Sequence, residues 1–400
     1  MEVPAPALVD TGSKYLYPNY RQAPMILVRG RGCEVWDAEG RRYLDLYAGI
    51  AVSTLGHAHP RLVRAIAEQA EKLIHVSNYF YNEPNVRLAE KLCALTGMER
   101  ALFSNSGAEA NEAMLKLTRR YFFTRGEPDR YRIIAFENSF HGRTLGALAM
   151  TGQAKYRDGF GPLPGVTHVP YGDLDAVRRA MGPDVAGIIV EPIQGEGGVV
   201  PAPAGFIAGL RAIANERGAL LLADEVQTGV GRTGSFLGFQ NERVVPDAVA
   251  LAKALGGGVP IGVMLCKAHL LEALPPGSHG STFGGNPLAS AAALAVLAAL
   301  EAENLVAGAA EKGDALARML EGLAARHPAV ATGARGRGLL QALVLRENID
   351  ARELLGKLRE AGLLLTQAGS HGLRFSPPLV VKISELEEGV AIVDRVLAAR

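Results

Sequence analysis

Short apolar runs alternate with segments of helical spacing through the middle of the chain. Each run is four or five residues long and is bounded by polar or turn-forming residues, as is typical of strands buried on both faces of a sheet. The alternation predicts an α/β domain whose mostly parallel sheet has helices on both faces. The predicted strands are Ala101–Ser104, Ile133–Phe136, Val166–Val169, Gly187–Val190, Ala219–Ala223, Ala248–Leu251 and Ile261–Leu265.

The two ends of the chain have a different pattern. Residues 1–24 contain four prolines, and we expect this segment to be irregular. Short alternating runs then indicate a small meander of strands. An alanine-rich helix over Pro287–Leu300, continuing to Ala325, leads out of the sheet domain. The tail beyond it ends in a predicted helix over Glu385–Leu397 and has the mixed pattern of a separate α+β unit.

Charge balance and cysteine usage argue against several classes of protein. The chain has 42 Lys and Arg against 41 Asp and Glu, whereas nucleic-acid-binding domains usually carry a basic excess. Its three cysteines lie far apart and form no CxxC, so we predict neither a zinc site nor a disulfide framework. His57 and His59 have no third ligand at a suitable spacing. We therefore expect no metal and no nucleic acid.

The sequence pattern predicts neither a signal peptide nor a membrane span. The N-terminal sequence MEVPAPALVD lacks the apolar core of a signal peptide. The longest apolar run, Pro287–Leu300, is too short to span a bilayer. These features predict a soluble, cytoplasmic protein without a membrane partner.

Two of the predicted strands deliver a charged residue to the edge of the sheet where ligands bind in open α/β folds. Asp224 follows one of these runs directly, and Lys253 follows the other after a single alanine. Apolar surroundings lower the pKa of a lysine and make its amine nucleophilic. Asp224 either forms a structural ion pair with Lys253 or holds the protonated ring nitrogen of a pyridine cofactor. The second arrangement is the pattern of pyridoxal phosphate enzymes.

A phosphate group of such a cofactor needs its own binding site. The segment Ser104–Glu109 lies between a predicted strand and a helix expected over Ala110–Arg120. Free amides at a helix N-terminus bind phosphate, and Gly107 lets the backbone approach closely. Ser106 and Glu109 also have the spacing of a plain capping box, which is compatible with phosphate binding.

Further polar residues stand in apolar or glycine-rich surroundings. Phe140 offers a ring for stacking and Arg143 a clamp for a carboxylate, although without other context Phe140 is a core residue and Arg143 a surface residue. Glu191–Gly198 brings acids to the end of another predicted strand. Arg374 lies in an apolar run and is either paired internally or binds an anionic ligand.

A GxGxxG pattern over Gly229–Gly234 suggests a dinucleotide site. Such a fingerprint opens a helix and has an acid about 20 residues further on, whereas Ser235–Phe239 shows no helical face. We interpret the pattern as a glycine-rich loop. A dinucleotide-binding regulator is also disfavoured by Asp224 and Lys253 together.

Taken together, these motifs resemble those of the class III aminotransferases of the fold-type-I pyridoxal phosphate family, from about Tyr20 to the end. The resemblance is strongest to members that act on N-acetylornithine. It implies a large cofactor-binding domain over residues 59–300, with residues 1–58 and 301–400 as the N- and C-terminal parts of a smaller α+β domain. The motifs are Ser104-Asn-Ser-Gly-Ala-Glu-Ala-Asn-Glu112, Phe140-His-Gly-Arg-Thr144, Glu191-Pro-Ile-Gln-Gly-Glu-Gly-Gly198, Asp224-Glu-Val-Gln-Thr-Gly229, Ala252-Lys-Ala-Leu-Gly-Gly-Gly258 and His279-Gly-Ser-Thr-Phe-Gly-Gly-Asn-Pro287.

The resemblance also implies roles for individual residues toward pyridoxal 5′-phosphate. Lys253 binds the cofactor covalently and moves the proton, and Asp224 pairs with the pyridine nitrogen. Thr282 reaches the phosphate in the partner subunit, so the active unit is expected to be a homodimer with active sites at its interface. Ser106, Gly107 and Ala108 bind the phosphate. Phe140 lies on one face of the ring, and Val226 and Gln227 lie on the other.

The implied reaction has two substrates that share one site. Arg143 and Ser281 bind the carboxylate end of N-acetylornithine, and Arg374 binds the α-carboxylate of glutamate. Glu196 masks Arg374 when the other substrate is bound. The terminal amino group of N2-acetyl-L-ornithine passes to 2-oxoglutarate, giving N-acetyl-L-glutamate 5-semialdehyde and L-glutamate, a reaction of arginine biosynthesis.

Other substrates and a related reaction stay open from the sequence. Relatives with these motifs act on ornithine, succinylornithine, succinyldiaminopimelate, 4-aminobutyrate or carrier-bound lysine precursors. The segment around Ile50 lacks the tyrosine usual in ornithine aminotransferases, which leaves room for an acylated substrate. A fold-type-I aminomutase is the other alternative, but Arg143 and Arg374 together favour two-substrate transamination.

Overall fold

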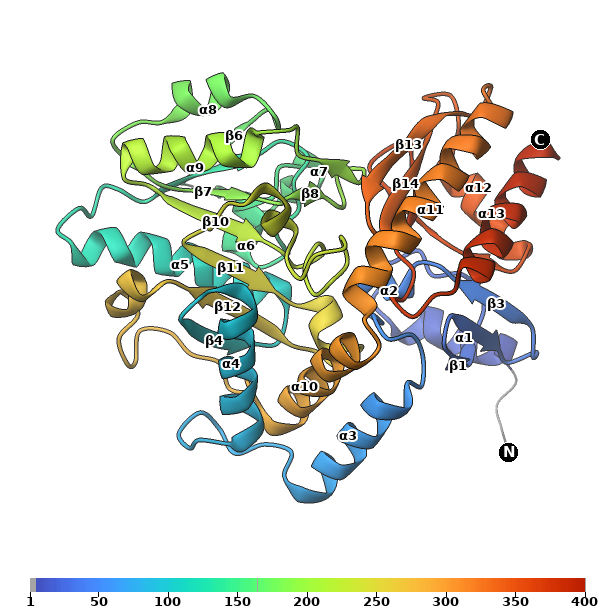
Figure 1. Cartoon of the computed structure of the whole chain (residues 1–400), viewed down its shortest axis with the longest axis horizontal. Coiled ribbons are helices and arrows are strands. Elements are labelled where there is room, and N and C mark those ends of the chain that lie inside the picture. Colours follow the sequence, from blue (N-terminus) through green and yellow to red (C-terminus); the bar gives the residue numbers. More distant parts are fainter. Residues whose placement is uncertain (1–4, 164, 400) are drawn as a thin grey trace.

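The computed structural model describes residues 5–163 and 165–399 and has two parts (Figure 1). The larger part is built on a seven-stranded sheet of order β4-β12-β11-β10-β7-β5-β6. Strand β12 is antiparallel to both of its neighbours, and the other neighbouring strands are parallel. The strands are β4 (Arg100–Ser104), β5 (Arg132–Phe136), β6 (Val166–Val169), β7 (Val185–Val190), β10 (Leu220–Asp224), β11 (Ala248–Leu251) and β12 (Gly262–Cys266). The predicted mostly parallel sheet is therefore confirmed.

Helices cover both faces of this sheet, because its central strands β7, β10, β11 and β12 are buried at every position. Along β10, Leu220 and Leu222 pack in the layer of α5 (Gly107–Thr124). Leu221, which points the other way, packs with α8 (Leu174–Ala180) and α9 (Phe206–Arg217). Figure 1 shows α8 and α9 on one side of the sheet and α5 on the other.

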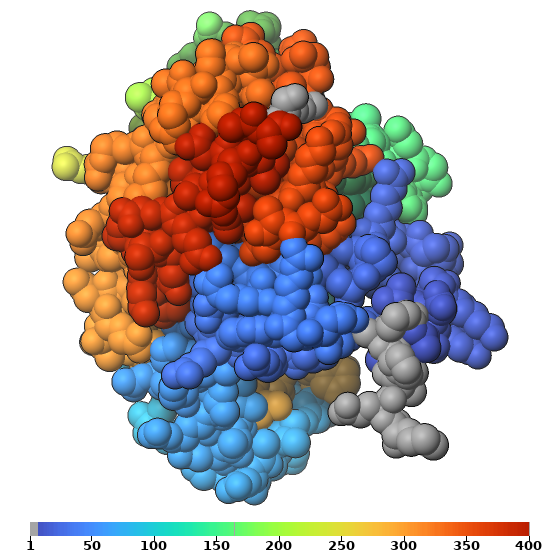
Figure 2. All heavy atoms as spheres, turned by 90° about the vertical axis from the view of Figure 1, so that its right-hand side faces the viewer, coloured from blue at the N-terminus to red at the C-terminus, as the bar shows by residue number. Residues whose placement is uncertain are grey.

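The smaller part combines both ends of the chain, as Figure 2 shows from its outer side. The C-terminal β15 (Leu363–Leu364) pairs in parallel with the N-terminal β3 (Arg42–Asp45), extending the meander of β1 (Leu27–Arg31) and β2 (Glu34–Asp37). A second sheet has the order β13-β14-β17-β16. Its strands are β13 (Ala331–Arg337), β14 (Leu340–Leu345), β16 (Thr366–Ala368) and β17 (Gly372–Phe375). The domain limits at residues 58 and 300 stay a prediction.

Two predictions about helices were wrong. The N-terminal segment is not wholly irregular, because Ala5–Tyr15 forms α1; Pro6 lies in its first turn, where a proline removes no intrahelical hydrogen bond. Residues 1–4 lie outside the described residues. The helix expected to continue to Ala325 breaks at Asn304, whose φ is 49°. It forms α10 (Pro287–Ala302) and α11 (Leu305–Arg326), bent by 67°.

Helices surround these sheets elsewhere along the chain. No single helix in the described residues has both the length and the apolar character needed to cross a membrane, and only the bent pair α10–α11 meets that test jointly. The other elements are α2 (Ala48–Ala51), α3 (Pro60–Lys72), α4 (Glu83–Thr96), α6 (Leu145–Met150), α7 (Ala154–Arg157), α12 (Ala351–Glu360), α13 (Ile383–Ala398), the strands β8 (Ile193–Gln194) and β9 (Val200–Pro201), and the 3₁₀ helices η1 (Gly238–Glu242), η2 (Lys253–Gly256) and η3 (Ala268–Ala273).

Candidate active site

Asp224 and Lys253 line the same cavity, of about 370 Å³, beyond the ends of two adjacent strands. Strands β10 and β11 run in parallel, with Asp224 opposite Ala250. Asp224 ends β10, and Lys253 begins η2 just after β11. Lys253 has a φ of 41°, a conformation that non-glycine residues seldom adopt and that is concentrated at functional sites. The sequence-based expectation that the two residues meet at this edge is confirmed.

The carboxylate of Asp224 is buried and held by three donors. His141 Nδ1 and Asn111 Nδ2 each lie 2.7 Å from Oδ2, and the Val226 amide donates to Oδ1 at 3.0 Å. Burial acts to lower the pKa of His141, but the hydrogen bond to Asp224 and the carboxylate charge outweigh it and raise that pKa. The network fixes the carboxylate and aligns it toward the cavity.

Sequence reasoning gave neither His141 nor Asn111 a role. His141 lies between Phe140 and Arg143 in a motif whose flanking side chains offered more obvious functions. Asn111 is on the buried face of α5. An amide side chain at a buried helix position is a usable signal, because such groups need partners.

The amine of Lys253 lies among charges of both signs. Burial is the main cause that lowers its pKa; Glu196 acts to raise it and Arg374 to lower it further. The net lowering increases the neutral, nucleophilic fraction of the amine at neutral pH.

The N-terminus of α5 faces this cavity. Ser106 Oγ accepts from the Glu109 amide at 3.2 Å and donates to Glu109 Oε2 at 2.9 Å, and the same carboxylate oxygen accepts from the Asn105 amide. This confirms the predicted Ser106–Glu109 cap. The first amides of a helix have no intrahelical acceptor, and those of Gly107 and Ala108 lie in the cavity wall.

Glycine is required at Gly107 because the start of α5 lies very close to the side chain of Val226. A Cβ at this position would lie 2.7 Å from Val226 Cγ1, so only glycine lets the helix start come this close to the segment after Asp224. The cavity thus combines an anion-binding helix end, a fixed carboxylate and a buried lysine. This donor and acceptor set fits a pyridine ring that carries a phosphate.

Arg374 lies on β17, 1 % exposed, and reaches the same region. Its Nη1 donates to Glu196 Oε1 at 2.5 Å and to Gln227 Oε1 at 3.1 Å, and its Nε donates to Thr366 Oγ1 at 3.1 Å. Burial acts to raise the pKa of Glu196, but the charge and hydrogen bond of Arg374, together with Lys253 and Gln227, outweigh it and lower that pKa. Glu196 is therefore ionised at neutral pH.

Phe140 and Arg143 line the mouth of this cavity. The Arg143 guanidinium stacks 4.0 Å from the centroid of the Tyr156 ring and 5.4 Å from that of Phe140. Among the described residues, it forms no ion pair with an acid. An arginine held by aromatic faces keeps its five N–H donors for a carboxylate.

Ser281 and Thr282 lie outside the cavity wall formed by this chain. Ser281 Oγ accepts hydrogen bonds from Asn105 Nδ2 at 3.2 Å and the Gly284 amide at 3.0 Å. Thr282 is exposed. The single chain therefore does not bring these two residues into its own site, and their roles stay predictions.

Comparison with known proteins gives a family match over almost the whole chain. The family model for aminotransferase class-III matches residues 15–397. An acetylornithine aminotransferase from Myxococcus xanthus is 52 % identical over 383 residues, 95 % of each chain. A succinylornithine transaminase/acetylornithine aminotransferase from Pseudomonas aeruginosa is 45 % identical over 96 % of this chain and 95 % of its own. A Toxoplasma gondii ornithine aminotransferase structure, described as having partial occupancy of PLP at its active site, is 35 % identical, with a TM-score of 0.94 over 98 % of this chain and 94 % of that one.

Proposed function

The chain belongs to the class-III aminotransferases, and within that family we propose that it transfers the terminal amino group of N2-acetyl-L-ornithine to 2-oxoglutarate. The products are N-acetyl-L-glutamate 5-semialdehyde and L-glutamate, as in arginine biosynthesis. The enzyme is an acetylornithine aminotransferase with pyridoxal 5′-phosphate as its cofactor. The observation that carries this function is the single cavity lined by Lys253, Asp224 and Glu196, in which Glu196 pairs with Arg374.

The residues of the cavity match the parts of that cofactor. Asp224, fixed by His141 and Asn111, would hold the protonated pyridine nitrogen, and the amides of Gly107 and Ala108 would hold the phosphate. When bound, pyridoxal phosphate supplies an electron-withdrawing ring that stabilises the negative charge left when a substrate C–H bond breaks.

Lys253 has two tasks in this account. Its amine, neutral in a larger fraction because of the lowered pKa, would hold the cofactor through Nζ. When Nζ is free, it would take the proton from the amine-bearing carbon of the donor. In the reverse half of the cycle Nζ returns a proton to Cα of the forming glutamate.

Arg374 and Glu196 allow one site to accept two different substrates. The reacting carbon of acetylornithine carries no carboxylate, so Glu196 neutralises Arg374, whose buried charge is costly when unpaired. Glutamate has an α-carboxylate next to its reacting carbon, and this group takes the place of Glu196 on the guanidinium. Arg143, held by Tyr156, binds the distal carboxylate of acetylornithine.

Succinylornithine is the second candidate donor. The Pseudomonas aeruginosa relative carries both activities in its description. A succinyl group ends in a carboxylate that an acetyl group lacks, so succinylornithine has two carboxylates where acetylornithine has one. The ratio of kcat/KM for the two donors therefore decides between them.

We also propose that the active unit is a homodimer. Large aromatic side chains are exposed beside the site, with Tyr79 at 91 %, Tyr81 at 97 % and Phe283 at 60 % of their surface accessible. A cluster of this kind marks a protein interaction surface. In such a dimer, Thr282, next to Phe283 in an exposed loop, is proposed to reach the site of the other subunit.

A panel of amino donors with 2-oxoglutarate tests the proposed substrate. Steady-state kcat/KM is measured for acetylornithine, succinylornithine, ornithine and 4-aminobutyrate with the holoenzyme. We expect acetylornithine to exceed ornithine by at least about tenfold, equivalent to about 1.4 kcal/mol. A preference for ornithine or 4-aminobutyrate would contradict the assignment.

A further inference from the structure

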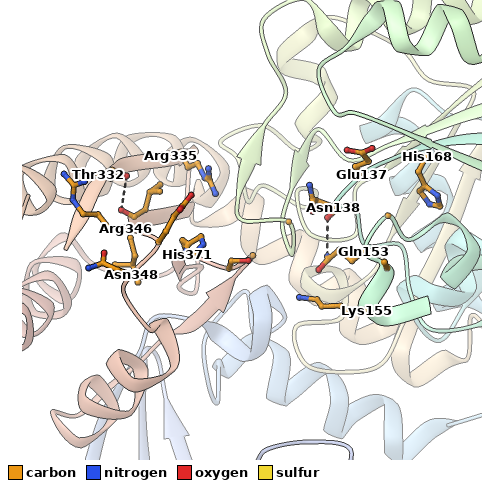
Figure 3. Close-up of a pocket in the computed structure, with 18 of the residues that line it drawn as sticks. Glu137, Asn138, Gln153, Lys155, His168, Thr332, Arg335, Arg346, Asn348 and His371 are labelled. Carbon is orange, nitrogen blue, oxygen red and sulfur yellow. Dashed lines mark hydrogen bonds between the residues drawn. The ribbon is translucent and has the colours of Figure 1, made fainter. Parts of the chain in front are cut away.

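A second cavity, of about 1,210 Å³, lies between the two parts of the molecule and shares no lining residue with the active-site cavity. One wall is formed by the large part, through the loop after β5 and by α7. The other is formed by β13, the end of β14 and the turn before β17. Figure 3 shows the two sets of side chains facing each other across the space.

Positive charge predominates in this cleft. Its lining includes four Lys and Arg residues, two on each wall, against Glu137 and Glu347. Within the part of the chain that the structure describes, none of the four cations forms an ion pair with an acid. The cations are Lys155, Arg157, Arg335 and Arg346. A cleft lined by one sign of charge concentrates ligands of the opposite sign.

Arg157 is oriented by a neutral partner. Its Nη1 lies 3.2 Å from His168 Nδ1, while His168 Nε2 lies 3.3 Å from the Met150 carbonyl. Burial, and then the charge of Arg157, lower the pKa of His168 to about 4. His168 is therefore a neutral acceptor at Nδ1, so it directs the guanidinium without cancelling its charge. The Nε of Arg157 is buried and has no hydrogen-bond partner among the described residues.

The opposite wall is arranged in a similar way. Arg335 Nε donates to the Gly198 carbonyl at 2.9 Å, again a neutral acceptor, which leaves its charge uncompensated. His371, on the same wall, has a buried Nδ1 without a partner in the described residues. Buried polar groups normally have partners, so those that lack one indicate a missing ligand or water.

We propose that this cleft binds a small molecule with two anionic groups, one held by Arg157 and Lys155 and the other by Arg335 and Arg346. Guanidinium groups on both walls suit bidentate recognition of phosphate or carboxylate. The volume far exceeds that of a single inorganic ion and lies just above the range of about 300–1,000 Å³ usual for small-molecule sites, so the cleft has room for a metabolite with two anionic groups. A molecule bound there would also lie next to Gly197, which directly follows Glu196 of the active site.

Isothermal titration calorimetry on the holoenzyme, saturated with its cofactor, tests this site. Fructose 1,6-bisphosphate and citrate serve as probes with more than one anionic group, which separates phosphate esters from polycarboxylates, and inorganic phosphate serves as the single-group probe. We expect fructose 1,6-bisphosphate or citrate to bind once per chain, at least tenfold more tightly than inorganic phosphate. The affinity should fall as salt rises. The cofactor absorbance must stay unchanged during the titration, because displacement at the cofactor phosphate site would count against the cleft.

Variants locate the binding. Arg335→Ala and Arg157→Ala should each weaken it by at least tenfold. Lys155→Ala, at an exposed position, keeps the test informative if an arginine variant does not fold, and should weaken binding by at least threefold. Arg337→Ala removes the same charge from the same strand, outside the cleft, and should bind as the parent does. Absence of saturable binding by both fructose 1,6-bisphosphate and citrate, or unchanged affinity in all three cleft variants, would overturn the proposal.

Discussion

Glu196 Oε1 lies 2.5 Å from Nη1 of Arg374, so the arginine that suits an α-carboxylate is already paired within the chain. The two residues come from distant parts of the sequence, and Gln227 shares the same guanidinium nitrogen. In the proposed reaction, glutamate displaces Glu196 from Arg374 and acetylornithine does not. The movement of the Glu196 side chain away from Arg374 would therefore distinguish the two half-reactions.

Glu196→Ala should affect the two half-reactions in opposite directions. Without the carboxylate, Arg374 is free for 2-oxoglutarate, whose KM should fall severalfold. The acetylornithine half-reaction then leaves an unpaired buried cation beside the reacting carbon, and its kcat/KM should drop about 10- to 100-fold, or roughly 1.4–3 kcal/mol. Rapid-mixing spectroscopy of each half-reaction measures the two effects separately. Equal losses in both would contradict the masking role.

Arg374→Lys should weaken the glutamate half-reaction selectively. Lysine keeps the charge but not the planar pair of donors that holds a carboxylate. We expect KM for 2-oxoglutarate to rise about tenfold or more, while kcat/KM for acetylornithine changes much less. Arg337→Lys, on β13 of the same sheet but outside the active-site cavity, serves as the matched control. A selective loss for acetylornithine would reverse the assignment of Arg374.

His141→Gln should change the pH dependence of stability. The folded-state pKa of His141 is raised by Asp224, so its charge stabilises the fold fully below the unfolded pKa of about 6.5. That stabilisation is lost as pH rises through the raised folded-state value. The difference in thermal midpoint between parent and variant holoenzyme should therefore be larger at pH 6 than at pH 9. A constant difference across this range would show that Asp224 does not hold a charged imidazole.

Gly107→Ala should weaken cofactor binding by steric displacement. The new methyl group would meet Val226 Cγ1 at 2.7 Å, which pushes the start of α5 away from the cavity. Titration of the apoenzyme with pyridoxal phosphate should show at least a tenfold rise in Kd. Val226→Ala as a second change should recover part of that loss relative to Val226→Ala alone. No recovery would mean that the glycine serves another purpose.

Patterns along the chain predicted the sheet domain well because its strands are buried on both faces. The prediction also placed Asp224 and Lys253 at one edge, since the C-terminal ends of parallel strands lie together. The cap of Ser106 by Glu109 was equally local and equally visible in the sequence.

Contacts between residues that are far apart in the sequence could not be predicted from these local patterns. The glycine-rich loop around Arg232 illustrates this limit: its buried guanidinium donates to the carbonyls of Leu339 and Pro377 in the smaller part of the molecule. The loop thus ties the two parts together. Similarly, the contact of Asn111 with Asp224 spans 113 positions, and no local periodicity encodes such a pairing.

The most direct test of the account is the visible spectrum and half-reaction of Lys253→Ala. The parent enzyme with pyridoxal phosphate should show a visible absorbance band that bleaches when glutamate is added. The variant should lack the band of the lysine-bound cofactor and lose at least about 10⁴-fold in kcat, or roughly 5 kcal/mol. Lys267→Ala, which changes a partly exposed lysine outside the cavity, should behave as the parent. An unchanged spectrum and turnover in Lys253→Ala would contradict the central claim.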